Sequence, residues 1–100
     1  MSKFLVTYHG GGMPSDPAQA AQAKAAFGAW LADAGKAVVD PGAPVQMVAQ
    51  VSQGASSEKV AIGGYTVIEA PTQEDAIRLL KKHPFVARGG TLQLNQVMAV

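Results

Sequence analysis

The sequence predicts a small α+β domain: one four-stranded antiparallel sheet with two helices on one of its faces. Strand-like apolar runs and two helical patterns follow one another in the order β-α-β-β-α-β. Each helical pattern begins at a recognisable cap. A chain of 100 residues has room for one domain, which we take to span residues 1–100.

The first strand and the first helix have clear signals. Residues 4–8 combine aromatic and β-branched side chains and are followed by three glycines, which predicts a strand. The loop 10–16 leads to Asp16 and Pro17, an acidic N-cap and a proline at the first helical position. They predict a helix over Pro17–Ala34, rich in alanine and closed by Gly35.

The middle of the chain predicts a hairpin. Residues 37–44 contain two prolines and a glycine, so we expect a short extended connection there. Residues 45–51 alternate apolar and polar side chains, the period of a strand. Residues 52–59 are small and polar and predict a turn into the next strand, residues 65–69.

The last third predicts a helix and a closing strand. Thr72 is the expected N-cap, two acidic residues occupy the first turn, and Pro84 stops the helix. Residues 91–97 form the final strand. Four strands and two helices in this order predict the ferredoxin-like split βαβ sheet.

The second face of this sheet is expected to be covered as well. Leu5 lies between Phe4 and Val6, so apolar side chains point to both sides of the first strand. Because two helices cover one face only, we predict that a second copy of the chain covers the other. The expected assembly is a homodimer through the sheet face.

Composition excludes several classes of function. Eight basic and seven acidic residues give a net charge of +1, without the clustered basic residues that nucleic-acid binding requires. The absence of cysteine excludes disulfide scaffolds and thiolate metal sites. The apolar run at the start is too short for a signal segment or a membrane span, so we expect a cytoplasmic protein with no membrane partner.

Several stretches resemble the YCII-related (YciI-like) family. The resemblance implies a ferredoxin-like fold that dimerises sheet to sheet as a dimeric α/β barrel. It also implies a pocket near the dimer interface, where some members are proposed to use a His–Asp pair and one branch dehydrochlorinates a hydroxylated aromatic. The first helix here carries no histidine, which departs from that pattern. The resembling stretches are residues 27–31, 34–36, 38–44, 63–70, 73–76 and 83–94.

The two histidines are the candidate catalytic residues. Imidazole can accept and donate a proton near neutral pH, so His9, at the end of a strand, or His83, at the end of a helix, could act as a general base. The alternative for His9 is a strand-terminal side chain without chemistry. For His83 it is a protonated imidazole that stabilises the carboxyl end of the second helix.

Arg88 and Tyr65 are the candidate ligand-binding residues. Arg88 could hold an anionic group beside His83, and the Tyr65 phenol could donate a hydrogen bond, although Tyr65 could equally be a packing residue. Phe27 and Trp30 share a helical stripe and are expected in the core. The glycines 10–12 could bind phosphate, but they lack the lysine of a phosphate loop, so we expect an entry loop or lid.

We expect neither an organic cofactor nor a metal, because the two histidines and Asp40 have no close ligand spacing. The leading hypothesis is an acid–base enzyme, of lyase or hydrolase type, acting on a small aromatic or anionic molecule at a dimer-edge pocket. A non-catalytic small-ligand-binding or interaction module is the first alternative. A cofactorless monooxygenase-like protein is the second.

Overall fold

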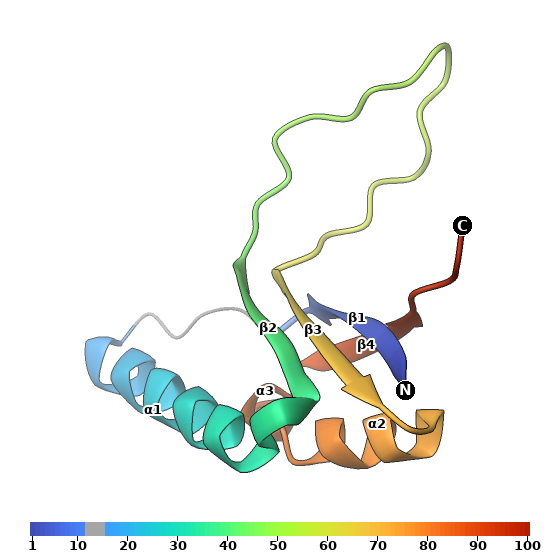
Figure 1. The fold of residues 1–100 in the computed structure, drawn as a ribbon. Coiled ribbons are helices and arrows are strands. Elements are labelled where there is room, and N and C mark those ends of the chain that lie inside the picture. Colours follow the sequence, from blue (N-terminus) through green and yellow to red (C-terminus); the bar gives the residue numbers. More distant parts are fainter. Residues whose placement is uncertain (12–15) are drawn as a thin grey trace.

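The computed structural model describes residues 1–11 and 16–100 (Figure 1). Residues 12–15 lie outside the described part, and with them most of the predicted loop 10–16 and its phosphate-loop and lid interpretations. The elements are β1 (Ser2–His9), α1 (Pro17–Ala34), the 3-10 turn η1 (Gly35–Ala37), β2 (Val38–Pro44), β3 (Gly64–Ala70), α2 (Gln73–Lys81), α3 (Pro84–Ala87) and β4 (Thr91–Gln96).

The four strands form one antiparallel sheet in the order β2-β3-β1-β4. The helices lie together on one side of it (Figure 1). This is the ferredoxin-like α+β fold, so the predicted fold class is confirmed.

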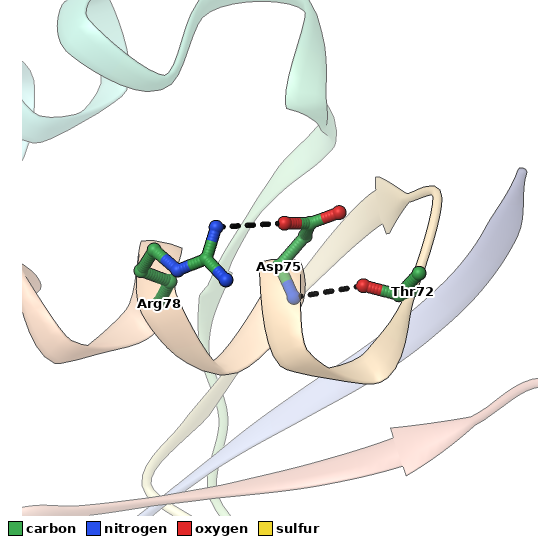
Figure 2. A network of polar contacts seen from close by, with 3 residues as sticks. All are labelled: Thr72, Asp75 and Arg78. Atoms are coloured by element: carbon green, nitrogen blue, oxygen red, sulfur yellow. Dashed lines mark hydrogen bonds and ion pairs between the residues drawn. The ribbon is translucent and has the colours of Figure 1, made fainter.

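Both long helices begin at the predicted caps. The Asp16 carboxylate accepts a hydrogen bond from the backbone N–H of Ala18 at 2.9 Å, and α1 ends at Gly35 with a positive φ of 57°. In α2 the Thr72 hydroxyl accepts from the Asp75 backbone N–H at 3.1 Å (Figure 2). Asp75 also pairs with Arg78 at 2.9 Å, but both side chains are exposed and the pair adds little stability.

The core lies between the sheet and the helices. Trp30 of α1 is its largest member, and its indole N–H donates to the carbonyl of Leu79 at 3.2 Å. The predicted core position of this side chain is confirmed, and Phe27 packs against it. The other buried members are Phe4, Val6, Ile68, Ala70, Ala76 and Leu80.

The opposite side of the sheet carries no helix, and we call it the open face. Strand alternation and register place on it Lys3, Leu5, Thr7 and His9 of β1, Tyr65, Val67 and Glu69 of β3, and Thr91, Gln93 and Asn95 of β4. Leu5 and Val67 are the aliphatic residues of this set. The open face is therefore of mixed polarity, in contrast to the apolar face that the first strand suggested.

The second strand lies earlier in the chain than predicted. Residues 37–44, expected as a connection, contain β2, and the predicted strand 45–51 has no strand structure. β2 tolerates Pro41 because it is an edge strand with register shifts. Gly42 has a φ of 75°, and a Cβ built on it would lie 1.7 Å from the carbonyl oxygen of Tyr65, so this irregular stretch requires glycine.

Residues 45–63 form an arm that leaves the sheet on the side away from the helices (Figure 1). The predicted turn 52–59 lies at its far end. A hydrogen bond from the backbone N–H of Val45 to the carbonyl of Gly63, at 3.1 Å, closes the base of the arm. The N–H of Gly63 in turn donates to the carbonyl of Tyr8 at 2.7 Å, which ties this base to β1.

The end of the chain differs from the prediction in one element. α2 ends at Lys81, and Pro84 begins the short helix α3 instead of only stopping the helix before it. The proline fits there because the first position of a helix needs no N–H. No helix within the described residues is long and apolar enough to cross a membrane.

Candidate functional site

His83 lies inside the core, between α2 and α3. Its side chain is 2% exposed, and Nδ1 accepts a hydrogen bond from the backbone N–H of Phe85 at 3.0 Å, which caps α3. Aromatic rings surround it: the centroid of Trp30 is 4.4 Å away and that of Tyr8 is 5.2 Å away. This imidazole is packed as a core side chain on the helical side of the sheet.

A chain of hydrogen bonds leads from His83 to β2. The Tyr8 hydroxyl lies 2.8 Å from Nε2 of His83 and 2.7 Å from Oγ1 of Thr66. The Thr66 hydroxyl donates to the carbonyl of Pro41 at 2.9 Å. These contacts connect the α2–α3 junction, β1, β3 and β2.

The two ends of this chain fix the direction of every bond in it. Because a carbonyl only accepts, Thr66 donates to Pro41, so Tyr8 donates to Thr66 and accepts from Nε2–H of His83. At the other end, the Phe85 N–H needs a lone pair on Nδ1, which again places the proton of a neutral ring on Nε2. Both arguments give the same tautomer.

The environment of His83 opposes a positive charge. Burial, and secondarily the positive charge of Arg88, lower its pKa to about 4. Protonation of Nδ1 would also set a second donor against the Phe85 N–H. The predicted cationic role at the carboxyl end of α2 is therefore wrong, because the ring is buried at the start of α3. Burial likewise raises the pKa of Tyr8.

His9 lies on the open face and is half-buried. Its Nδ1 is 3.0 Å from the carbonyl of Ala61 on the arm, so Nδ1 carries a proton that it donates. Nε2 is 2.8 Å from the hydroxyl of Thr7. A hydroxyl can donate to a neutral Nε2 or accept from a protonated one, so these partners suit both charge states of the ring.

Tyr65 belongs to the same side of the sheet as His9. It is paired with Thr7 across β1 and β3, while Gln93 of β4 is the partner of Thr7 on the other side. The open face therefore brings an imidazole, a phenol and an amide into neighbouring positions.

Arg88 lies on the helical side. Its guanidinium is 5.7 Å from the ring centroid of Phe85, and it borders a shallow depression of about 460 Å³. The other residues around this depression are Gln19, Gln22, Ala23, Ala26 and Pro84. The four predicted site residues thus form two groups: His83 with Arg88 beneath the sheet, and His9 with Tyr65 on the open face.

Asp40, the carboxylate considered for a metal site, accepts from the backbone N–H of Gly42 at 2.9 Å. Within residues 1–11 and 16–100, no three residues of the His, Cys, Asp and Glu types gather as metal ligands would.

The sequence analysis missed three side chains that contact the histidines: Thr7, Tyr8 and Thr66. Strand period two could have placed Thr7 beside His9, because positions i and i+2 share a face. Tyr8 and Thr66 gave no such signal, since Tyr8 meets His83 across 75 positions of sequence.

No protein-family model and no curated protein matches this chain. Among solved structures, it is similar to 5-chloro-2-hydroxyhydroquinone dehydrochlorinase from Burkholderia phenoliruptrix AC1100, in complex with 2,5-dihydroxybenzoquinone. The TM-score is 0.56 at 15% sequence identity, over 93% of this chain and 91% of the other. The likeness supports a YciI-like, ferredoxin-like fold.

Proposed function

We propose that this protein is an acid–base enzyme acting on a small aromatic or anionic molecule at the open face, with His9 as the group that moves the proton. The observation that carries the proposal is the pair of partners around the His9 ring. Ala61 holds Nδ1–H, and Thr7 can bond Nε2 whether or not it carries a proton. A general base needs this tolerance, because it must exist in both states during turnover.

The surrounding groups give the ring a direction and the ligand a place. The Ala61 carbonyl fixes the tautomer, so Nε2 is the nitrogen that accepts the proton. When Nε2 becomes protonated, the Thr7 hydroxyl turns and accepts from it. The phenol of Tyr65 donates to a ligand oxygen, and its ring offers a surface for an aromatic ligand.

The chemical class follows from these groups. An imidazole and a phenol can remove a proton and stabilise the resulting oxyanion, which is chemistry of the lyase or hydrolase type. The name of the structural neighbour, a dehydrochlorinase in complex with 2,5-dihydroxybenzoquinone, supports a hydroxylated aromatic as the ligand. This chemistry calls on no organic cofactor.

In this proposal His83 is a positioning residue. Both of its ring nitrogens are engaged, and it holds Tyr8, the residue that precedes His9. The contacts therefore favour His9 over His83 as the proton carrier. Arg88, considered for binding an anion, lies on the helical side and takes no part in the His9 site.

We further propose that a second copy of the chain covers the open face and encloses the ligand. Leu5 and Val67 give that face an aliphatic centre, and Leu5 is 37% exposed in the single chain. A closed, partly desolvated cavity would strengthen the hydrogen bonds that Tyr65 and His9 make to the ligand.

A non-catalytic small-ligand-binding module is the second candidate. It is favoured by the partner of His9 Nδ1, which is a neutral carbonyl. An adjacent carboxylate would stabilise the imidazolium more strongly than a carbonyl does.

The test uses 2,5-dihydroxybenzoquinone as a probe, with two readouts. Calorimetric titration measures binding, and proton NMR in deuterated water measures whether the protein accelerates exchange of the ring hydrogens of the probe. We expect both in the wild type, with H9Q at least tenfold weaker in exchange. Gln22→Ala, on the helical side, is the matched control and should behave as the wild type.

The outcomes separate the candidates. Binding without accelerated exchange would support the binding module against the enzyme. Equal exchange by the wild type and H9Q would remove His9 from the reaction, and absence of binding by the wild type would contradict both candidates for this ligand class.

A further inference from the structure

We infer that the arm, residues 45–63, docks on a second copy of this chain and lies along that copy's open face. The inference deepens the proposed function, because it names what completes the His9 site, and it rests on the proposed sheet-face dimer. It concerns the arm as an interaction surface, so it can be tested without any ligand.

The accessible surface of the single chain is too large for a compact monomer. It measures 7093 Å² for a mass of 10.3 kDa. The scaling of monomeric proteins gives about 5,400 Å² for this mass, so the excess is about 1,700 Å². A standard interface removes about 800 Å² from each partner, and homodimer interfaces often remove more. The excess has the size of a stable dimer contact.

The dimensions of the chain agree with this conclusion. The radius of gyration is 14.8 Å, whereas about 13 Å is expected for a folded domain of this length. The longest dimension is 44 Å and the shortest is 19 Å. Figure 1 shows where the extension comes from, since the arm projects well beyond the sheet.

The arm has the chemistry of a segment that is covered in its working state. Val48 is 92% exposed and Val51 is fully exposed. The facing legs at the base of the arm enclose an open groove of about 310 Å³ lined mainly by apolar side chains. Its lining consists of Val45, Gln46, Met47, Lys59, Val60, Ala61 and Ile62.

The pattern of residues 45–51 is that of a strand, yet the single chain gives it no strand partner. Among the described residues, the backbone hydrogen bonds outside the regular elements that reach the arm lie at its base, at Val45 and Gly63. An extended segment with exposed apolar side chains and free backbone groups is suited to pairing with another chain.

The surroundings of the arm favour a second copy over a different partner. The arm and the C-terminal tail both leave the sheet on the side away from the helices (Figure 1), so an occupant of the open face lies beside both. The arm contains one acidic and one basic residue, Glu58 and Lys59, and the open face pairs Lys3 with Glu69. Neither surface has a net charge that would select a strongly acidic or basic partner.

Two-fold symmetry satisfies both surfaces at once. In an isologous contact each arm lies on the open face of the other copy, so both apolar arms and both open faces are covered together. The exposed tail residues Val97 and Met98 add to the same contact.

Docking of the arm also bears on the candidate site. Ala61, whose carbonyl orients His9, belongs to the arm. An arm held by the second copy fixes this carbonyl, and through it the tautomer of His9. The site is therefore complete only in the dimer.

The test uses the absence of cysteine from the chain. One batch carries Met47→Cys on the arm and the other carries Gln93→Cys on the open face. The two are mixed and treated with a short bismaleimide, and the bridged positions are read by peptide mass spectrometry. We expect a product that joins position 47 of one copy to position 93 of the other. Met47→Cys mixed with Gln22→Cys, on the helical side, is the matched control and should give little product.

A second measurement follows the oligomeric state by sedimentation. The wild type should be a dimer at micromolar concentration. Met47→Asp combined with Val60→Asp should weaken the dimer at least tenfold, whereas Ser56→Asp near the tip should leave it unchanged. A monomeric wild type would overturn the inference and leave the arm to a different partner. A dimer that links position 47 to position 22 as readily as to position 93 would overturn the placement of the arm.

These readouts are independent of chemistry. A 47–93 product together with H9Q that retains full probe exchange would support the arm contact and refute the role of His9. Loss of the contact with a His9-dependent reaction would do the reverse.

Discussion

The two histidines of this protein lie on opposite faces of one sheet and form opposite hydrogen-bond patterns. His83, beneath the sheet, donates from Nε2 and accepts at Nδ1, whereas His9, on the open face, donates from Nδ1. A backbone N–H faces Nδ1 of His83, and a hydroxyl faces Nε2 of His9. The first partner requires a lone pair, and the second accommodates either charge state.

The difference shows that the neighbours of an imidazole decide its use more than its place in a motif does. A ring sealed among Trp30, Phe27 and Tyr8 can tie elements together but cannot readily exchange a proton with a ligand. A half-buried ring beside a reversible hydroxyl can. We therefore assign stability to the first histidine and chemistry to the second, and the following experiments test that division.

The largest expected difference is in stability. His83→Ala should lower the free energy of unfolding by about 4 kcal/mol, because it leaves a cavity and removes the partners of the Phe85 N–H and the Tyr8 hydroxyl. His9→Ala, on the more exposed face, should lower it by less than about 1 kcal/mol. Urea denaturation at pH 7 measures both. Equal losses would contradict the division.

The next effect is a pH dependence that belongs to His83. Its pKa is lowered to about 4 in the folded protein, from 6.5 in the unfolded chain. Between these values the unfolded chain binds more protons, so the stabilising contribution is complete above pH 6.5 and is lost as the pH falls toward 4. The loss from this residue is about 3 kcal/mol between pH 7 and pH 4.

The measurement compares urea denaturation of the wild type and His83→Gln across that range. Carboxylates titrate in both proteins, so only the difference between them reports on His83. We expect the two stability curves to converge as the pH falls toward 4. Parallel curves would show that the imidazole is charged, or accessible, in the folded state.

The smallest effect compares two tyrosines with the same substitution. Tyr8→Phe removes the hydroxyl between His83 and Thr66 and should cost about 1.5 kcal/mol of stability. Tyr65→Phe on the open face should change stability by no more than about 0.5 kcal/mol but weaken binding of the benzoquinone probe. Denaturation and probe titration together test this, and a larger stability loss in Tyr65→Phe would place its hydroxyl in the structure instead of the site.

Local signals predicted most of the fold. The caps Asp16 and Thr72 set the starts of α1 and α2 as expected, because capping acts between near neighbours. β2 was misplaced for a physical reason. Pro41 and Gly42 are typical of a turn, but an edge strand with a bulge accepts both, and that setting depends on the sheet.

The candidate site was only half predictable. His9 and Tyr65 were selected by residue type, and strand register brings them to one face. The role of His83 depends on Tyr8 and Trp30, which are distant in sequence, so helix position alone gave the wrong charge for it. The contact of His9 with Ala61 depends on the path of the arm, which the alternating pattern of residues 45–51 did not predict.

The closed base of the arm makes it a detachable module. Since Val45 and Gly63 are already joined by a hydrogen bond, residues 46–62 could be replaced by a tight turn of the kind that connects hairpin strands. Such a shortened chain would keep its sheet and helices yet lack Ala61, leaving the His9 ring free to rotate. Grafting arms of other lengths onto the same base would give protein engineers a way to change pairing and ligand enclosure while the scaffold stays constant.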